Sequence, residues 1–414
     1  SPGGTKGRII GLQNNFLLNG GWTYDCSFIV SDCLQLRVDS SYYVPNYGTS
    51  ADVCQTNTAS NTAFRTMGLI QGIVMQEEAI EAAAHQMQML PENVRAKNLY
   101  QEGQLTPFGQ VLKDCYIQRV FDFTRKAKFP GWDAKKMTFD QRWEAVKKFN
   151  KQNRWRKRGI SLIPVKYGSG FNLPMLEQAG ALVEVFDSDG TVLVRTGGIE
   201  MGQGLNTKIA QVASYYLGIP IGLIRVAELD TAVVPHPTST GASTGSGFNA
   251  EAVRAACEDL MARLKEYCRI KELPFPCNNQ RRWDPDDLTN TNWKTAVSKA
   301  HGDRINLSSQ SRVAIEGGEK VDGEGLYFHP HTKEQTPEKN YNFTGYTYSA
   351  AIAEVEVDVL TGETVVLQAD IVYDMGKSQN PAVDTGQIEG AFVQGIGYVM
   401  YEELVYQPED TPLP

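Results

Sequence analysis

The order of strand and helix patterns is the feature of this chain that most limits how it can fold. A long helical pattern covers Asn61–Met89, whereas strand patterns gather further along in a hairpin. The hairpin joins Ala181–Val185 to Thr191–Val194 through the turn Ser188-Asp189-Gly190. A doubly wound sheet needs strands and helices in regular alternation, and this chain lacks it. We therefore expect an α+β fold of mixed sheets with packed helices.

The other expected elements follow from the same periodicities. Leu90-Pro91-Glu92 should end one helix and start the next, since proline suits the first helical position. Further strands are expected over residues 6–18, 160–165, 223–227, 351–359 and 363–372, and further helices over 138–158, 206–217, 249–267, 293–301 and 387–402. The rest of 270–345 should be a long loop region. We place a domain boundary where helix passes to strand at Arg158-Gly159, which gives domains 1–157 and 158–414.

Composition and charge exclude several classes of protein. The 414 residues are 41% hydrophobic and 21% charged, which is ordinary for a globular chain. The net charge of −8 is spread along the chain, so we expect neither nucleic acid nor a membrane as a partner. Residues 147–158 are rich in lysine and arginine and could contact a polyanion, although a solvated helix end is the commoner meaning of such a run.

Cysteine usage and the two ends of the chain add three expectations. Seven widely spaced cysteines without a CxxC pair argue against a disulfide framework or a zinc site. A reducing, cytoplasmic compartment fits best. The chain begins with Ser-Pro-Gly-Gly and ends in the turn-rich Pro408–Pro414, so both ends look truncated.

Three segments have the composition of a binding site for a polar ligand. Gly197–Gly204 lies between a strand and a helix, where backbone N–H groups can approach a ligand closely, and Gln203 at its apex offers donors and acceptors. Pro237–Gly247 is almost wholly hydroxyl-bearing or small, and Asp384–Gly395 again combines glycine with glutamine at an expected helix start. Taken singly, each segment could be a plain connection. Together they indicate one large polar cofactor held by uncharged groups.

Four segments, in this order, closely resemble the molybdopterin-binding subunit of xanthine dehydrogenases and aldehyde oxidases. They are Asn61–Arg65, Gln178–Leu182, Gly197–Lys208 and Gly386–Gly395. The resemblance extends from about Lys6 to Tyr406. It implies the molybdopterin-binding fold of that family, with residues 1–157 as the C-terminal part of the first subdomain and 158–414 as most of the second.

The resemblance also implies roles for individual residues. Gln203 would contact the oxo ligand of molybdenum, and Phe171 would stack on the substrate ring. No residue of the chain would bind the metal directly. The other cofactor contacts would come from Gly202, Phe64, Arg65, Ala242, Ser243, Gln387 and Gln394.

The implied activity is the oxidation of an electrophilic carbon with oxygen taken from water. Electrons would leave through iron–sulfur clusters and FAD in other parts of a homodimeric parent protein. The general base of the family, a glutamate in a Gly-Glu-Pro-Pro segment, would lie beyond Pro414, and a Phe-Gly-Gly loop would precede Lys6. We therefore expect this chain alone to be inactive and largely free of molybdenum cofactor.

Three substitutions relative to the family bear on the substrate. Cys33 aligns with the arginine that grips a purine, and a neutral thiol cannot make charge-assisted bonds. Met67 replaces the second aromatic ring of the substrate site, and Asn172 replaces a threonine. These changes favour aldehydes or N-heterocycles over xanthine. The alternatives are a xanthine dehydrogenase, or a non-catalytic scaffold that keeps the fold without the metal site.

Overall fold

The computed structural model describes residues 6–131, 133, 135–171, 174–275, 289–314, 319–321, 325–327 and 343–405. They form two compact units. Unit 1 holds the described residues of 6–171 and 343–376, and unit 2 holds those of 174–327 and 377–405. Both units combine helices with sheets, so the predicted α+β class is confirmed.

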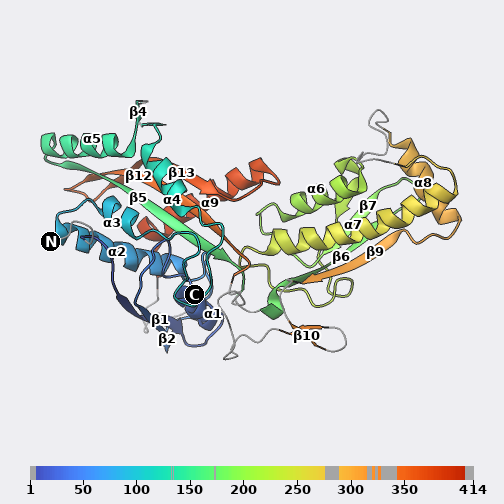
Figure 1. Cartoon of the computed structure of the whole chain (residues 1–414), viewed down its shortest axis with the longest axis horizontal. Helices are drawn as coiled ribbons and strands as arrows, with labels where there is room; N and C mark the ends of the chain where they lie inside the picture. Colours follow the sequence, from blue (N-terminus) through green and yellow to red (C-terminus); the bar gives the residue numbers. More distant parts are fainter. Residues whose placement is uncertain are drawn as a thin grey trace, which may run out of the picture. The chain divides into compact units, whose positions relative to one another are not determined.

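Unit 1 is built around a three-stranded antiparallel sheet in the order β13-β12-β5. Leu162 of β5 and the alternate residues Tyr348, Ala350 and Ile352 of β12 are buried, so one face of the sheet forms the core. Helices α2 to α5 accompany this sheet (Figure 1). The elements of unit 1 are β1 (Leu12–Gly21), α1 (Ser27–Gln35), β2 (Tyr47–Gln55), α2 (Leu69–Met87), α3 (Pro91–Asn98), α4 (Ile117–Lys126), β3 (Phe129–Pro130), β4 (Lys136–Met137), α5 (Phe139–Gln152), β5 (Arg156–Ser169), β12 (Gly345–Asp358) and β13 (Thr364–Asp374).

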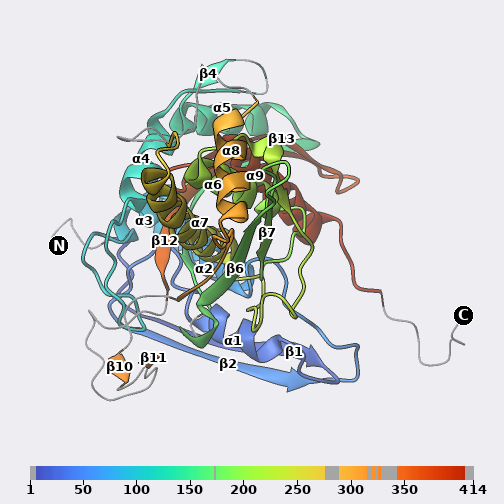
Figure 2. The ribbon, with the colours of Figure 1, turned by 90° about the vertical axis from the view of Figure 1, so that its right-hand side faces the viewer.

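A second sheet of unit 1 pairs β1 and β2 in parallel, with α1 lying over them (Figure 2). Phe16, Leu34 and Val38 form its small core. The strand predicted over residues 6–18 is therefore present, although β1 begins only at Leu12.

The helix predicted from Asn61 begins eight residues later, at Leu69. Thr66, Met67 and Gly68 all have positive φ, which an α-helix cannot accommodate. At Gly68 a Cβ atom would lie 2.7 Å from the carbonyl oxygen of Val30, so close packing against α1 forces this conformation. That packing is tertiary, and the local helical pattern does not contain it.

The passage from α5 to β5 also differs from the prediction. α5 ends at Gln152, and β5 already begins at Arg156. The predicted boundary between residues 157 and 158 therefore falls inside a continuous strand, and unit 1 continues to Phe171. A buried ion cluster ties α5 to the sheet, because Arg142 pairs with Glu354 of β12 (Nη2 to Oε2, 3.0 Å) and with Asp370 of β13.

Unit 2 contains a four-stranded sheet in the order β8-β7-β6-β9. Figure 1 shows α6 and α7 lying along one face of it. Ala181, Val183 and Val185 of β6 face these helices and are buried with Leu260 and Leu264 of α7. The elements of unit 2 are two 3-10 turns (Pro174–Leu176 and Ile221–Leu223), β6 (Gln178–Val185), β7 (Val192–Thr196), α6 (Leu205–Leu217), β8 (Ile224–Val226), α7 (Gly245–Ile270), α8 (Thr291–Gly302), β9 (Ser308–Ala314), β10 (Glu319–Val321), β11 (Gly325–Tyr327) and α9 (Pro381–Met400).

The predicted hairpin of β6 and β7 is confirmed. Gly190 in its turn has a φ of +72°, and the ring of Trp293 packs against it and donates its Nε1–H to the Gly190 carbonyl at 2.8 Å. By contrast, β9 lies in the region predicted as a long loop and was missed. Its sequence is Ser-Ser-Gln-Ser-Arg-Val-Ala, too polar to show strand alternation, and β9 lies at the edge of the sheet.

The last helix begins earlier than predicted, at Pro381 rather than Gln387. The side chain of Asn380 accepts hydrogen bonds from the N–H groups of Ala382 and Val383 and so caps the helix. Gln387 consequently lies in the second turn of α9, not at its start. In the part of the chain that the structure describes, no helix is long and apolar enough to cross a membrane.

Candidate cofactor site

The Gly197–Gly204 turn connects β7 to α6, as predicted, and depends on two of its glycines. Gly202 and Gly204 have φ values of +97° and +79°, which favour glycine strongly over other residues. Open space surrounds the position of a Cβ at Gly202, but at Gly204 a Cβ would lie 2.8 Å from the side chain of Val383. Gly204 is thus needed both for its backbone conformation and for the close approach of α9.

The turn is organised by Glu200, which was not predicted from the sequence. Its carboxylate accepts backbone N–H groups from Gly202 and Gly204 at 2.9 and 3.0 Å, and from Asn206 at 2.9 Å. Partial burial acts to raise the pKa of Glu200, but these N–H bonds outweigh it and lower the pKa below the usual range. The N–H of Asn206 in the first turn of α6, and those of the two glycines before it, therefore meet an anion supplied by the chain itself.

Gln203 lies at the apex of this turn, as predicted, and its amide is used within the loop. Its Nε2 donates to the Ile199 carbonyl at 2.8 Å, and its Oε1 accepts from the N–H of Met201. An amide nitrogen carries two hydrogens, so this nitrogen keeps one further donor for a ligand.

The hydroxyl-rich loop Pro237–Gly247 lies directly against the turn. The Thr240 hydroxyl accepts the N–H of Ile199 at 2.9 Å. Ala242 and Ser243, both predicted to meet the cofactor, have φ values of +52° and +62°. Two successive non-glycine residues in this region store strain of about 1–3 kcal/mol each, and such strain is typical of ligand-binding segments.

At the start of α7, Asn249 adds a buried polar group that faces this loop. Its Nδ2 donates to the Gly245 carbonyl at 2.8 Å, but its buried Oδ1 has no hydrogen-bond partner among the residues that the structure describes. Asn249 lines a hollow together with Thr238 and Ser239. The hollow holds about 10 Å³, the size of one water molecule, so a pterin ring could lie over it but not inside it.

Helix α9 brings the third predicted segment to the same turn. Lys208 of α6 pairs with Asp384 of α9 (Nζ to Oδ1, 3.2 Å), and Asn380 donates to the Gln211 side chain at 3.0 Å. Gln387 and Gln394 both lie on α9, one helical heptad apart, and both are half-buried. The turn, the loop and α9 are distant in sequence but converge within unit 2.

The other predicted site residues belong to unit 1. Phe64 and Arg65 lie in the irregular segment before α2, with Phe64 half-buried and Arg65 exposed, and Met67 follows them with a φ of +46°. Cys33 lies on α1 and is 1% exposed. A substrate could touch its thiol only if the surrounding side chains moved aside, so its role in substrate choice stays a prediction.

Phe171 follows the end of β5 and is buried. Arg37 holds the preceding residues, because its guanidinium donates to the carbonyls of Gly168 (3.2 Å) and Gly170 (3.1 Å) and stacks 4.6 Å from the centroid of the Phe343 ring. This arrangement fixes the backbone before Phe171. Asn172 lies outside the described residues.

The groups present in unit 2 fit the pterin cofactor expected from the resemblance. A pterin edge presents both donors and acceptors and is matched by uncharged groups of both kinds. Gln203 offers an amide hydrogen, Asn249 offers a buried oxygen without a partner, and Ser243 brings a hydroxyl on strained backbone. These three groups carry no charge, and that they hold the cofactor stays a prediction.

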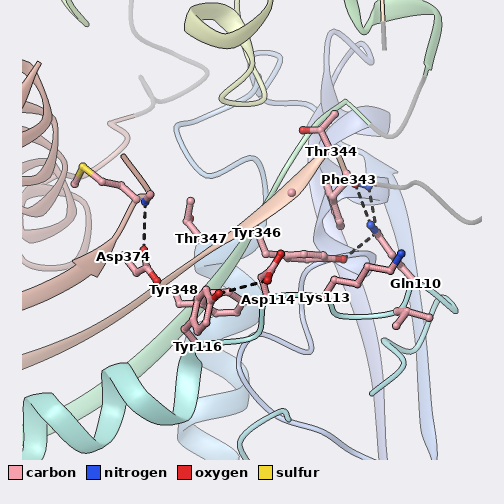
Figure 3. A pocket seen from close by; sticks show the side chains of 14 residues that line it. Gln110, Lys113, Asp114, Tyr116, Phe343, Thr344, Tyr346, Thr347, Tyr348 and Asp374 are labelled. Carbon is pink, nitrogen blue, oxygen red and sulfur yellow. Dashed lines mark hydrogen bonds between the residues drawn. The ribbon is translucent and has the colours of Figure 1, made fainter. Parts of the chain in front are cut away.

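A separate cavity of about 410 Å³ lies in unit 1 (Figure 3). Gln110 on its wall is bonded to the backbone of Phe343 and to the Tyr346 hydroxyl, and Tyr116 donates to Asp114. These polar groups satisfy one another. The predicted site residues are not among those that line this cavity.

The basic run of residues 147–158 is used largely within unit 1. Lys157 donates to the carbonyls of Asn150 and Asn153, both at 2.6 Å, at the end of α5. Arg158 pairs with Glu356 at 2.8 Å and stacks on Phe149. These contacts favour the structural meaning of the run over a polyanion site.

Known proteins match nearly the whole chain. Profiles of the molybdopterin cofactor-binding domain match residues 4–99 and 132–414. The xanthine dehydrogenase/oxidase of Gallus gallus is 39% identical over 98% of this chain and 27% of that protein, and aldehyde oxidase 4 of Cavia porcellus is 37% identical over 98% and 27%. The chain thus spans about a quarter of the length of these relatives.

Solved structures share the fold. Quinoline 2-oxidoreductase from Pseudomonas putida 86 superposes with a TM-score of 0.72 and 19% identity over 97% of this chain and 50% of that one. Aldehyde oxidoreductase from Desulfovibrio gigas gives 0.70 and 22% over 94% and 38%. Because one profile alone covers residues 132–414, which is more than half of the chain, the resemblance is confirmed. The chain belongs to the molybdopterin cofactor-binding domain family of the xanthine dehydrogenase and aldehyde oxidase type.

Proposed function

We propose that this chain holds the pterin cofactor of a molybdenum hydroxylase that oxidises aromatic aldehydes or N-heterocycles. The observation that carries the proposal is the convergence of the Gly197–Gly204 turn, the Pro237–Gly247 loop and α9, which are linked by the Thr240 bond to Ile199 and by the Lys208–Asp384 ion pair. Each of the three segments brings a predicted cofactor contact, namely Gln203, Ser243 or Gln387.

When bound, the molybdenum cofactor would supply two-electron oxidation of carbon with oxygen from water. The residues of this chain would bind and orient it. Gln203 would direct its remaining amide hydrogen toward the cofactor, and Ala242 and Ser243 would meet it through backbone and hydroxyl groups. Gln387 and Gln394 would bond the pterin edge from one face of α9, while Phe64 and Arg65 would line the metal side.

Cys33 and Phe171 support the choice of substrate. An aromatic ring at Phe171 suits a flat substrate. A buried neutral thiol at Cys33 offers a purine no charged partner. A second candidate is a xanthine dehydrogenase. It is favoured by the sequence identity, which is 39% to the xanthine dehydrogenase/oxidase of Gallus gallus and 37% to aldehyde oxidase 4.

The wider setting of the parent protein is part of the proposal. Iron–sulfur clusters and FAD in other domains would carry the electrons away, and the parent would be a cytoplasmic homodimer. In sequence, residues 1–157 and 158–414 would correspond to the two molybdopterin-binding subdomains, although β5 continues across this boundary and unit 1 ends only after Phe171. Proteolysis of the purified parent, with sequencing of the stable fragments, tests that division.

Specificity constants of the full-length parent decide between the two substrates. We expect kcat/KM for benzaldehyde or a simple N-heterocycle to exceed that for xanthine by about 10²-fold, since a site that lacks a charged partner discriminates at this level. Cys33→Ala is the matched control and should leave the ratio unchanged, because neither a thiol nor a methyl group offers a purine a charged partner. A higher kcat/KM for xanthine would establish the second candidate instead.

A further inference from the structure

Glu200 lies inside the Gly197–Gly204 turn as an internal anion. One carboxylate oxygen accepts N–H groups from Gly202 and Gly204, and the other accepts the N–H of Asn206. The first amides of a helix lack partners within the helix and commonly meet an external anion such as phosphate. Here the Glu200 carboxylate meets the N–H of Asn206 in the first turn of α6 and those of Gly202 and Gly204 just before it, so these three N–H groups are not directed at the cofactor.

Gln203 lies between the two glycines that Glu200 holds. Both Gly202 and Gly204 have positive φ, and glycine reaches many other conformations at little cost, so bonds to their N–H groups are what hold the loop in this one. The Gln203 amide is in turn bonded to Ile199, on the other side of Glu200 in the chain. The direction of this side chain therefore depends on the backbone that the Glu200 carboxylate fixes.

We infer that Glu200 is a positioning residue, which aims the Gln203 amide at the cofactor by holding the backbone N–H groups of Gly202 and Gly204, the residues on either side of it. The inference rests on the proposed function, because it requires a pterin cofactor at Gln203. Glu200 is itself exposed, and no residue of the buried core depends on its carboxylate among the bonds described here. Its loss should therefore loosen the turn and leave the fold intact.

Hydrogen exchange in the full-length parent tests the structural half of the inference without reference to activity. In Glu200→Gln and Glu200→Ala, the amides of Gly202, Gly204 and Asn206 should exchange at least about tenfold faster than in wild type. The reason is that the carboxylate that accepts all three N–H groups is weakened as an acceptor in the first variant and lost in the second. The amides of α7 should be unchanged. Glu272→Gln removes the same charge from an exposed position after α7 and is the matched control. Unchanged exchange at the three amides would overturn the inference.

A double-variant cycle tests whether Glu200 acts through Gln203. Turnover per bound molybdenum should fall about 10²-fold in Gln203→Ala, because one oriented donor is lost. It should fall about tenfold in Glu200→Gln, because that donor is present but misplaced. The turnover of the double variant should equal that of Gln203→Ala, because the loss of Glu200 cannot misplace a Gln203 side chain that has already been removed.

The outcomes separate the two proposals. Losses that multiply in the double variant would show that Glu200 acts independently of Gln203, and the inference would fail while the proposed function stands. A Glu200→Gln protein that unfolds at a much lower temperature than wild type would show a structural role and would also overturn it. Wild-type parent purified without pterin would overturn the proposed function and, with it, this inference.

Discussion

Replacing Gly204 with alanine should separate α9 from the glycine turn, and Gly202→Ala provides a matched comparison. Both glycines have positive φ, so alanine at either position costs about 1–2 kcal/mol of backbone strain. Only at Gly204 would the new methyl group collide with Val383, at 2.8 Å, whereas at Gly202 no atom of the described part of the chain lies within 4 Å. Overpacking of this kind costs about 1–3 kcal/mol more.

The expected loss of unfolding free energy is therefore about 1–2 kcal/mol for Gly202→Ala and about 2–5 kcal/mol for Gly204→Ala. Urea unfolding of the parent protein measures both losses. Hydrogen exchange of the native variants then shows whether α9 has loosened. Val383→Ala removes the obstructing side chain. The double variant Gly204→Ala/Val383→Ala should consequently be no less stable than Gly204→Ala alone.

Equal losses for the two glycine variants would refute the reasoning, because they would mean that α9 does not pack against Gly204. Simple addition of the Gly204→Ala and Val383→Ala losses in the double variant would refute it as well. In either case the convergence of the turn with α9 would no longer support a shared cofactor site.

Three further predictions concern other parts of the chain. Arg142→Met leaves the buried carboxylate of Glu354 and the half-buried one of Asp370 without a cation and should cost about 3–5 kcal/mol in urea unfolding. Arg254→Met, whose ion pairs are more exposed, should cost at most about 1 kcal/mol; equal costs would contradict this. The hydrogen bond from Ser378, and then the charge of Lys208, hold the pKa of Asp384 below its usual range, so its contribution to stability is present above the unfolded pKa and lost as pH falls through the folded value. The destabilisation by Asp384→Asn should therefore begin to shrink at about pH 4 and continue to fall at lower pH; a difference that does not change with pH would contradict this. Burial raises the pKa of Cys257 to about 12, so a thiol reagent at pH 8 should leave it unmodified in the folded protein and modify it after unfolding; rapid labelling in the native state would show that α7 opens.

Local chemistry in the sequence was sufficient to predict several of these features. The Ser188-Asp189-Gly190 turn specifies its hairpin through a residue that must adopt positive φ, and Gly190 does so. The glycine turn was located correctly between β7 and α6. The start of α9 also had a readable signal, an Asn380 cap followed by proline at the first helical position, which periodicity alone did not reveal.

Features that depend on tertiary contacts could not be predicted in the same way. The late start of α2 results from the packing of Gly68 against α1, and β9 is a polar edge strand whose assignment comes from its pairing with β6. Glu200 was overlooked because its function in the turn arises from side chain to backbone bonds that appear only when the loop is folded. Its position between glycines, just before a helix, is the one signal that could have indicated it.

The central claim is that three segments of this chain hold one pterin cofactor, and the pterin and molybdenum content of the purified full-length parent tests it most directly. We expect about one of each per chain in wild type. Substitution of Gln387 by alanine on α9, or of Ser243 by proline in the hydroxyl-rich loop, should each reduce both contents severalfold, because each removes part of a common hydrogen-bond shell. Glu272→Gln should leave them unchanged. A parent protein that lacks pterin, or variants that retain it in full, would contradict the account.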